Sequence, residues 1–318
     1  MANIVVTGSL GTLGRPLVRA LQEQEHNVFE IDLMHNGAPR FFRADISNYR
    51  ELINALSMID SFCQQTTKHG IDYVFHLAAE FGRMNGELFY DKLWSTNAVG
   101  TKNILEAQKG GIFDKLVFFS SSEVYGETQA ESLSESLMDE LSIVQHNDYA
   151  ISKWVNEKQI MNHEKRTGLP VMRVRLFNAY GPGEYYHPFR SVVCLFCYRA
   201  LRNIPYQVYE GYHRVFMYVD DLIPSLTKCV GMFTPGMVIN IGGEEYRSVR
   251  ELSDIVLKNI GRDDSLVEYL PEDKHNTLSK KPNIELAKKV LGHNPTITLE
   301  EGVPKTIAWM RDIYGVTE

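Results

Sequence analysis

The chain has 318 residues, with 33 Lys and Arg against 40 Asp and Glu, so its formal charge is −7. Hydrophobic residues make up 44% of it and charged residues 23%, which is an ordinary globular composition and excludes disordered, collagen-like and coiled-coil classes. A mildly acidic chain is poorly suited to nonspecific nucleic-acid binding, so we expect no nucleic-acid partner. We also expect a cytoplasmic protein with no membrane partner, because no stretch reaches the roughly 18–20 apolar residues of a membrane span and the N-terminus has no basic region before its apolar run.

Apolar strands alternate with helical patterns through the first half of the chain. Continuous apolar strands between helices are typical of a parallel sheet covered on both faces, so we predict a doubly wound α/β fold of the Rossmann type. The predicted strands are 4–7, 28–32, 73–77, 115–119 and 171–176, and the predicted helices between them are 13–24, 49–68, 88–109 and 149–166.

The last third contains more loops and shorter helices, predicted at 249–260, 284–291 and 299–313. We therefore expect two domains, which is also what the length suggests. Residues 1–176 would form the sheet domain, with some later segments returning to it, and residues 177–318 mainly a smaller C-terminal α/β lobe.

The four cysteines, Cys63, Cys194, Cys197 and Cys229, are too few for a disulfide framework. Cys194 and Cys197 form one CxxC inside an apolar run, with no second pair or histidines at a zinc-binding spacing. We interpret them as buried helix residues and predict no metal site.

Gly8, Gly11 and Gly14 form a GxxGxxG pattern between the first strand and the first helix. Such glycines allow a tight turn and let the backbone approach a pyrophosphate, which the helix N-terminus also attracts. Asp32 ends the second strand, where a carboxylate accepts hydrogen bonds from a ribose diol and would repel the extra phosphate of NADP. The pattern predicts NAD binding, although glycines also make ordinary turns and Asp32 could be a turn carboxylate.

Tyr149 and Lys153 lie four residues apart, on one face of a predicted helix. A lysine cation beside a tyrosine favours the phenolate and so lets it act as a base near neutral pH. Ser121 and Ser122 follow the strand 115–119, and hydroxyl groups at the carboxyl end of a strand project into the crevice where ligands bind. These residues are our predicted catalytic group.

In order and spacing, these motifs resemble the extended short-chain dehydrogenases/reductases, the family of NAD-dependent nucleotide-sugar epimerases and dehydratases. The resemblance covers nearly the whole chain. Further matching segments are Ala44-Asp45-Ile46, His76-Leu77-Ala78-Ala79, Asn97-Ala98-Val99-Gly100-Thr101, Arg175 to Pro182, Tyr218-Val219-Asp220-Asp221 and Asn240-Ile241-Gly242-Gly243.

The resemblance implies a catalytic role for several residues. Tyr149 would remove the proton from a sugar hydroxyl while hydride passes to NAD, Lys153 would bind the nicotinamide ribose, and Ser121 would complete the triad with Ser122 as the near alternative. The implied cofactor-binding residues are Gly8, Leu10, Gly11, Thr12, Gly14, Asp32, Asp45, Ile46, Leu77, Ala78, Ala79, Asn97, Ser120, Tyr149, Lys153 and Phe177.

The resemblance also implies that the partner is a nucleotide-diphosphate sugar. Asn178 would flank its diphosphate, and Arg214 stands where the family usually keeps a phosphate-binding arginine, whose guanidinium suits a diphosphate. Arg83, in an unusual loop at 80–86, is expected to contact the sugar or a carboxylate, or else to lie on the plain surface. Asn97 would support the catalytic helix, although it could equally cap a helix, as could Asp220 and Asp221.

Glu123 favours one reaction within the family. The run Ser121-Ser122-Glu123-Val124-Tyr125-Gly126 resembles that of GDP-mannose 4,6-dehydratases and uronate decarboxylases, where a carboxylate could remove the proton at carbon 5 of a 4-keto sugar. We rank 4,6-dehydration first, then epimerisation, then decarboxylation. Ser122 stands where dehydratases of the dTDP-glucose type have an Asp, which leaves the departing hydroxyl without a carboxylic acid, and Glu123 could instead contact a sugar hydroxyl.

Two further expectations follow from the family. The helices 88–109 and 149–166 would pair across a two-fold axis as a four-helix bundle, making a homodimer. A non-catalytic NAD-sensing protein on the same scaffold is the remote alternative, since such proteins commonly lose the Tyr or the Lys that this chain keeps.

Overall fold

The computed structural model describes residues 1–128, 130–271 and 279–316. The chain folds into two compact units. Unit 1 contains Met1–Val124, Asn147–Arg175 and Ile223–Ile239, and unit 2 contains Tyr125–His146, Leu176–Leu222 and Asn240–Glu318. The chain therefore passes between the units several times.

A seven-stranded sheet runs through unit 1 in the order β11-β6-β5-β4-β1-β2-β3. The pairs β1–β2, β1–β4, β2–β3 and β4–β5 are parallel, which confirms the predicted α/β fold. The two edge strands β3 and β11 are not predicted from the sequence. The strands are β1 (Asn3–Thr7), β2 (Asn27–Asp32), β3 (Phe41–Arg43), β4 (Ile71–His76), β5 (Phe113–Ser121), β6 (Val171–Leu176) and β11 (Val238–Ile241).

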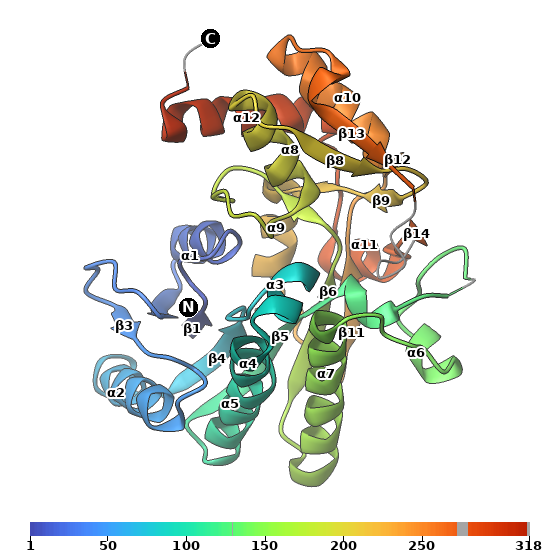
Figure 1. Cartoon of the computed structure of the whole chain (residues 1–318). Helices are drawn as coiled ribbons and strands as arrows, with labels where there is room; N and C mark the ends of the chain where they lie inside the picture. The colour runs from blue at the N-terminus through green and yellow to red at the C-terminus, as the bar shows by residue number, and fades with distance from the viewer. Residues whose placement is uncertain (129, 272–278, 317–318) are drawn as a thin grey trace. The chain divides into compact units, whose positions relative to one another are not determined.

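Helices cover both faces of this sheet. On one face α2 (Tyr49–Thr67), α5 (Gly100–Lys109) and α7 (Asp148–Thr167) pack into a shared core with the strands, as Figure 1 shows. Helix α1 (Gly14–Glu23) and the end of α9 (Val219–Lys228) are joined by a hydrogen bond from Gln24 Nε2 to Thr227 Oγ1 of 2.9 Å. Burial of these apolar faces is the main force that holds helices on the sheet.

The segment expected as one helix at 88–109 is broken in the structure, so that prediction is wrong in part. It contains α3 (Arg83–Leu88), α4 (Tyr90–Trp94), a π turn (Ser95–Val99) and then α5. Phe89 leaves the helical region, with φ −125° and ψ 51°, and separates α3 from α4. Because α3 begins at Arg83, the expected loop at 80–86 is also partly helical.

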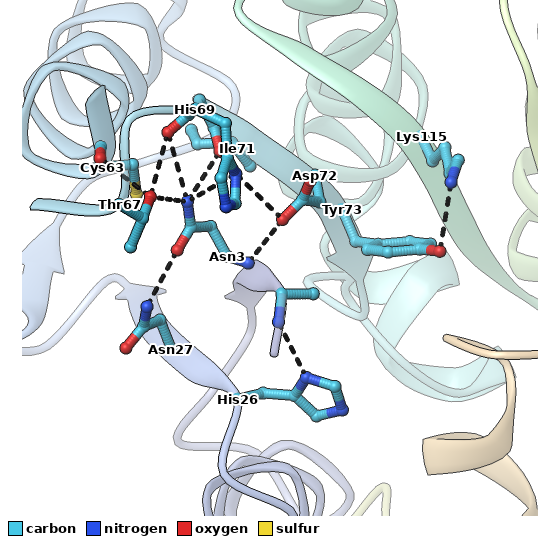
Figure 2. A network of polar contacts seen from close by, with 12 residues as sticks. Asn3, His26, Asn27, Cys63, Thr67, His69, Ile71, Asp72, Tyr73 and Lys115 are labelled. Atoms are coloured by element: carbon cyan, nitrogen blue, oxygen red, sulfur yellow. Dashed lines mark hydrogen bonds and ion pairs between the residues drawn. The ribbon is translucent and has the colours of Figure 1, made fainter.

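Polar side chains join the starts of three parallel strands (Figure 2). The backbone N–H of Asn3 donates to Asp72 at 2.7 Å, and the Asn3 side chain donates to Thr67 and accepts from Asn27. These bonds link β1 to β2 and to the start of β4, which helps to fix the register of the parallel strands. They lie at the amino ends of the strands. The candidate site lies at the other end, where β5 stops at Ser121.

The described residues of unit 2 form short helices and three small sheets. The helices predicted at 249–260, 284–291 and 299–313 are found within one residue of those bounds. Cys194 and Cys197 are buried and form no disulfide, as expected. The helices are α6 (Leu137–Glu140), α8 (Val192–Leu201), α10 (Val249–Ile260), α11 (Glu285–Leu291) and α12 (Leu299–Tyr314), and the strands are β7 (Ala179–Tyr180), β8 (Tyr206–Tyr209), β9 (His213–Val215), β10 (Met217–Tyr218), β12 (Tyr246–Ser248), β13 (Val267–Leu270) and β14 (Ser279–Lys280).

Within the described residues, none of the helices combines the length and apolar character that crossing a bilayer requires. The same residues contain no cluster of three or more His, Cys, Asp or Glu arranged as metal ligands.

Candidate active site

The candidate catalytic residues come from the start of α7 and the end of β5. Asn147 caps α7 by accepting the Ala150 N–H at 2.9 Å, and this start places Tyr149 and Lys153 one turn apart on the helix. β5 ends at Ser121, and a 3-10 turn over Ser122–Tyr125 follows it. The end of β5, the turn after it and the capped start of α7 therefore bring these groups together within unit 1.

Tyr149 contacts the end of β5. Its half-buried phenol is hydrogen-bonded to the Ser121 hydroxyl, which in turn accepts the backbone N–H of Glu123 at 3.2 Å. Burial and the Glu123 charge raise the pKa of Tyr149 to about 12, against the opposing effect of the Ser121 bond. The protein's own groups thus keep the phenol neutral near pH 7, and the expected lowering of its pKa by Lys153 is not found.

Lys153 is directed at the strand backbone. Its Nζ donates to the Phe119 carbonyl at 3.0 Å and lies 5.2 Å from the centre of the Phe118 ring. Burial lowers the pKa of Lys153 to about 8, although the nearby Glu157 carboxylate counteracts the shift. Lys153 remains a cation at neutral pH.

The three neighbouring serines differ in their surroundings. Ser121 contacts Tyr149, whereas the hydroxyl of Ser120 donates to Glu157 at 2.6 Å and is therefore already engaged. The Ser122 side chain is only 3% exposed. Of the predicted pair Ser121 and Ser122, the structure brings Ser121 to the phenol.

The glycine-rich turn has the shape that a dinucleotide needs. Gly8 has φ +71°, and a Cβ there would lie 2.7 Å from the backbone nitrogen of Ala78. Gly11 donates to the Gly8 carbonyl at 3.1 Å, and a Cβ on Gly14 would clash with that carbonyl. Only glycines fit this cradle, so the residues present fit NAD.

Asp32 fastens this turn to β2. One carboxylate oxygen accepts the Leu10 N–H at 2.9 Å and the other accepts the Leu33 N–H at 2.7 Å. Thr12 is half-buried just before α1. Leu77 and Ala78 are held to β1 by bonds to the carbonyl and hydroxyl of Thr7, and Ala79 follows them, half-buried.

Asp45 and Ile46 lie after β3. Burial tends to raise the pKa of Asp45, but hydrogen bonds from Ser47 and Lys92 hold it below its usual range. The Lys92 ammonium lies 3.1 Å from the carboxylate. Ile46 is buried against Gly100. A Cβ on Gly100 would lie 2.7 Å from the Cδ1 of Ile46, so the start of α5 lies close to this segment.

Asn97 and Arg83 connect the segment after β4 to α7. Asn97 is buried in the π turn and donates to the Ser152 hydroxyl at 2.9 Å, so it braces α7 and does not cap a helix. Arg83 begins α3, where its Nη2 lies 3.5 Å from Met84 Sδ. α3 packs on α7, since a Cβ on Gly86 would lie 3.6 Å from the backbone nitrogen of Tyr149.

Phe177, Asn178 and Arg214 belong to unit 2. Phe177 is fully buried, and Asn178, with φ +35°, donates to the Val215 carbonyl at 3.0 Å. Arg214 donates to the His213 carbonyl at 2.8 Å and pairs in register with Lys280 of β14. Asp221 accepts the N–H groups of Thr296 and Ile297, so it fastens that loop to α9.

Glu157 is a residue that the sequence analysis missed. It lies four residues after Lys153 on α7 and binds Ser120, Arg173 and Arg175. The repeated spacing of four in Tyr149, Lys153 and Glu157 was the available signal, because it places all three on one helix face.

Comparisons with known proteins agree with this geometry. The NAD dependent epimerase/dehydratase family matches residues 4–242. The UDP-N-acetyl-alpha-D-glucosaminuronate decarboxylase of Bacillus cytotoxicus is 29% identical over 97% of this chain and 98% of its own length. The UDP-glucuronic acid decarboxylase 1 of Xenopus tropicalis is 29% identical over 97% of this chain and 72% of its own.

A solved structure gives the same fold. A variant of the UDP-glucuronic acid 4-epimerase of Bacillus cereus, in complex with UDP-4-deoxy-4-fluoro-glucuronic acid and NAD, is 25% identical with a TM-score of 0.83, covering 98% of this chain and 100% of that one. The fold and the cofactor cradle define an NAD-dependent enzyme. The chain belongs to the NAD dependent epimerase/dehydratase family, which confirms the resemblance seen in the sequence.

Proposed function

We propose that this enzyme decarboxylates a UDP-uronate. The observation that carries the proposal is Ser122, a buried hydroxyl beside Glu123. Dehydration would need an acid to protonate the departing carbon-6 hydroxyl, and a serine is a poor acid for that step. The carboxylate of a 4-keto uronate is bonded to carbon 5, β to the ketone, and leaves as carbon dioxide without such a proton, so a serine suffices here.

The relatives support the same substrate class. The two curated relatives described above are decarboxylases whose names specify a UDP-linked uronate. The Bacillus cereus structure is an epimerase of UDP-glucuronic acid. All three names carry a sugar with a carboxylate at carbon 6, and on this basis we place decarboxylation ahead of the dehydration that the sequence alone favoured.

The proposed reaction begins and ends at carbon 4 of the sugar. Tyr149, as the phenolate, removes the proton of the carbon-4 hydroxyl, and its bond to Ser121 holds it in place. The turn at Gly8, Gly11 and Gly14 would hold NAD, which would supply the acceptor for the carbon-4 hydride and later its donor. The protein's own groups keep the phenol neutral near pH 7, so the phenolate would form once the positive charge of a bound nicotinamide ring adds to that of Lys153. Tyr149 then gives its proton back to the carbon-4 oxygen during the final reduction.

Carbon 5 needs one proton between these steps. When the bond between carbons 5 and 6 breaks, its electron pair stays on carbon 5 as an enolate and carbon dioxide leaves. A solvent proton then completes carbon 5, and we assign its delivery to the Glu123 carboxyl group. The balance is one uronate and one proton in, and one neutral sugar and one carbon dioxide out.

Arg83 is our proposed contact for the sugar carboxylate. It begins α3, which packs against the start of the helix carrying Tyr149. An arginine–carboxylate bond contributes roughly 1.5–3 kcal/mol, so Arg83→Met is expected to raise KM for a UDP-uronate roughly tenfold or more. The Kd for a UDP-hexose, which has no carboxylate, should change little.

Dehydration remains the second candidate because the Glu123 charge acts on Tyr149. A base at that position could remove the carbon-5 proton of a 4-keto sugar. The purified protein should be incubated with UDP-glucuronate and UDP-glucose, and the products weighed by mass spectrometry. Loss of carbon dioxide from UDP-glucuronate supports the proposal, whereas loss of water from UDP-glucose, or an unchanged mass with a new sugar NMR spectrum, contradicts it.

We also propose that two copies of the chain pair through α4, α5 and α7. Apolar side chains are exposed in α4 and α7, at Tyr90 and Met161, and in the residues just before α4 and α5, at Leu88, Phe89 and Val99. Exposed apolar groups of this kind are typical of contact surfaces. Light scattering should give twice the chain mass, and a monomeric mass at all concentrations would contradict the pairing.

A further inference from the structure

The end of β5 and the face of α7 are joined at successive helical turns. Ser121 bonds to Tyr149 through their hydroxyl groups, and the Phe119 carbonyl accepts the Lys153 ammonium at 3.0 Å. A shift of α7 along β5 would break both contacts together. The register between this strand and this helix therefore decides where both proposed catalytic groups lie.

Glu157 makes the third contact of this kind, one turn beyond Lys153. Its Oε1 accepts the Ser120 hydroxyl at 2.6 Å. Arg175 of β6 donates to both oxygens, from Nε to Oε1 at 2.9 Å and from Nη2 to Oε2 at 2.7 Å. Arg173 Nη1 lies 3.5 Å from Oε2. Glu157 and Arg175 are 2% and 3% exposed, so α7 is bonded to β5 and β6 through a buried carboxylate.

We infer that Glu157 is a positioning residue for the reaction: its carboxylate holds α7 in register with β5 and so sets where Tyr149 and Lys153 lie. The inference rests on the proposed function only in that Tyr149 and Lys153 are taken as the reacting groups. Arg175 binds the Glu157 carboxylate through two hydrogen bonds, and such a bidentate pair fixes the position of the carboxylate.

The Glu157 charge also acts on Lys153, so the positioning residue should have a measurable effect on the pH dependence of the reaction. Burial lowers the pKa of Lys153 to about 8, and Glu157 is the anion that raises it. From β4, the buried His76 faces Lys153 as a neutral ring, because burial and the lysine charge lower its pKa to about 3. On α7 itself Tyr149 is a neutral phenol, and from β6 Arg173 and Arg175 add two further cations that Glu157 binds.

The test is Glu157→Gln, which keeps the side-chain shape and removes the charge. We expect kcat for release of carbon dioxide from UDP-glucuronate to fall at least tenfold with little change in KM. The alkaline limb of its pH profile should move to lower pH by roughly one unit, because Glu157 raises the pKa of Lys153 and a nearby opposite charge shifts a pKa by about 1–3 units. A folded Glu157→Gln with the wild-type kcat and alkaline limb would overturn the inference.

Arg173→Gln is the matched control, since it changes a buried partner of the same carboxylate and leaves the Glu157–Arg175 pair. Its alkaline limb should stay where the wild type has it or move up. A downward shift equal to that of Glu157→Gln would mean that any damage to this cluster moves the profile, which would also overturn the inference.

Two further measurements keep the test decisive. If Glu157→Gln does not fold, the double variant Glu157→Gln/Arg175→Gln is compared with Arg175→Gln, from which it differs only in the Glu157 charge. The Lys153 ammonium, followed by NMR, should titrate at a lower pH in the double variant. This titration needs no turnover, so a wild type that is inactive with every nucleotide sugar would refute the proposed function alone. A Lys153 that titrates alike in Arg175→Gln and in the double variant would overturn the inference.

Discussion

The side-chain amide of Asn97 donates a hydrogen bond of 2.9 Å to the hydroxyl of Ser152, which joins the π turn to α7. The same residue donates to the Glu80 carbonyl at 3.2 Å and accepts the Glu80 N–H at 2.8 Å. π turns often mark functional sites. Here the turn places one buried amide where it braces both the segment after β4 and the helix that carries Tyr149 and Lys153.

Asn97→Ala should therefore lower both stability and turnover. It leaves buried polar partners unsatisfied, at a cost of roughly 1–3 kcal/mol, which thermal unfolding would register. We expect kcat to fall at least tenfold, since α7 loses its brace. Asn103→Ala is the matched control, because Asn103 bonds to the Ile46 and Ser47 carbonyls and does not touch Ser152. Equal losses of kcat in both variants would show that Asn97 has no special link to the site.

Gly8→Ala should abolish tight NAD binding. The substitution combines an unfavourable φ of +71° with a Cβ only 2.7 Å from the Ala78 backbone, so the cradle must open. Gly111→Ala has a similar φ of +77° but open space, so it should cost only backbone strain of about 1–2 kcal/mol without affecting NAD. Calorimetric titration with NAD separates the two. An unchanged Kd in Gly8→Ala would refute this location for the pyrophosphate.

Asp32→Asn tests the preference for NAD over NADP. The amide can still accept one of the two backbone bonds from Leu10 and Leu33, but it no longer repels a ribose phosphate. We expect the ratio of the Kd values for NADP and NAD to fall at least tenfold, which is about 1.4 kcal/mol. If the ratio stays constant, Asp32 is only a structural carboxylate of the turn.

His76 should make the protein less stable in acid. Its pKa is lowered from 6.5 to about 3 by burial and by Lys153, and its ring nitrogens lie 2.8 Å and 3.2 Å from the hydroxyls of Thr7 and Thr101. As the pH falls from 6.5 towards 3, the unfolded chain takes up a proton that the folded protein refuses, so the free energy of unfolding falls.

His76→Gln removes this titrating group and keeps a polar side chain between the two threonines. Urea unfolding at several pH values across this window should give a smaller acid loss in the variant than in the wild type. Parallel curves for the two proteins would mean that His76 titrates alike in the folded and unfolded states, which contradicts the prediction.

Local sequence features predicted much of this structure. The glycines at 8, 11 and 14 and the spacing of Tyr149 and Lys153 each express a backbone or helical constraint that neighbouring residues define, and the elements around them occur as predicted. The NAD cofactor and the family followed from the same motifs. The contact of Arg83 with a substrate stays a prediction, and the helix that Arg83 begins could not be predicted.

The remaining features depend on contacts distant in the sequence. The break at Phe89 and the π turn interrupt a segment whose apolar pattern reads as one helix. The pKa of Tyr149 depends on its burial and on Glu123, so the four-residue spacing to Lys153 could not give its direction. Glu157 was missed because its partners lie on β5 and β6, and a lone glutamate on a helix usually faces solvent.

The most direct test of the central claim is the mass of the product formed from UDP-glucuronate in deuterium oxide. Decarboxylation through a 4-keto sugar predicts a product that has lost carbon dioxide and carries one solvent deuterium at carbon 5, with Tyr149→Phe folded but inactive. A product of unchanged carbon count, with or without deuterium, would contradict the account.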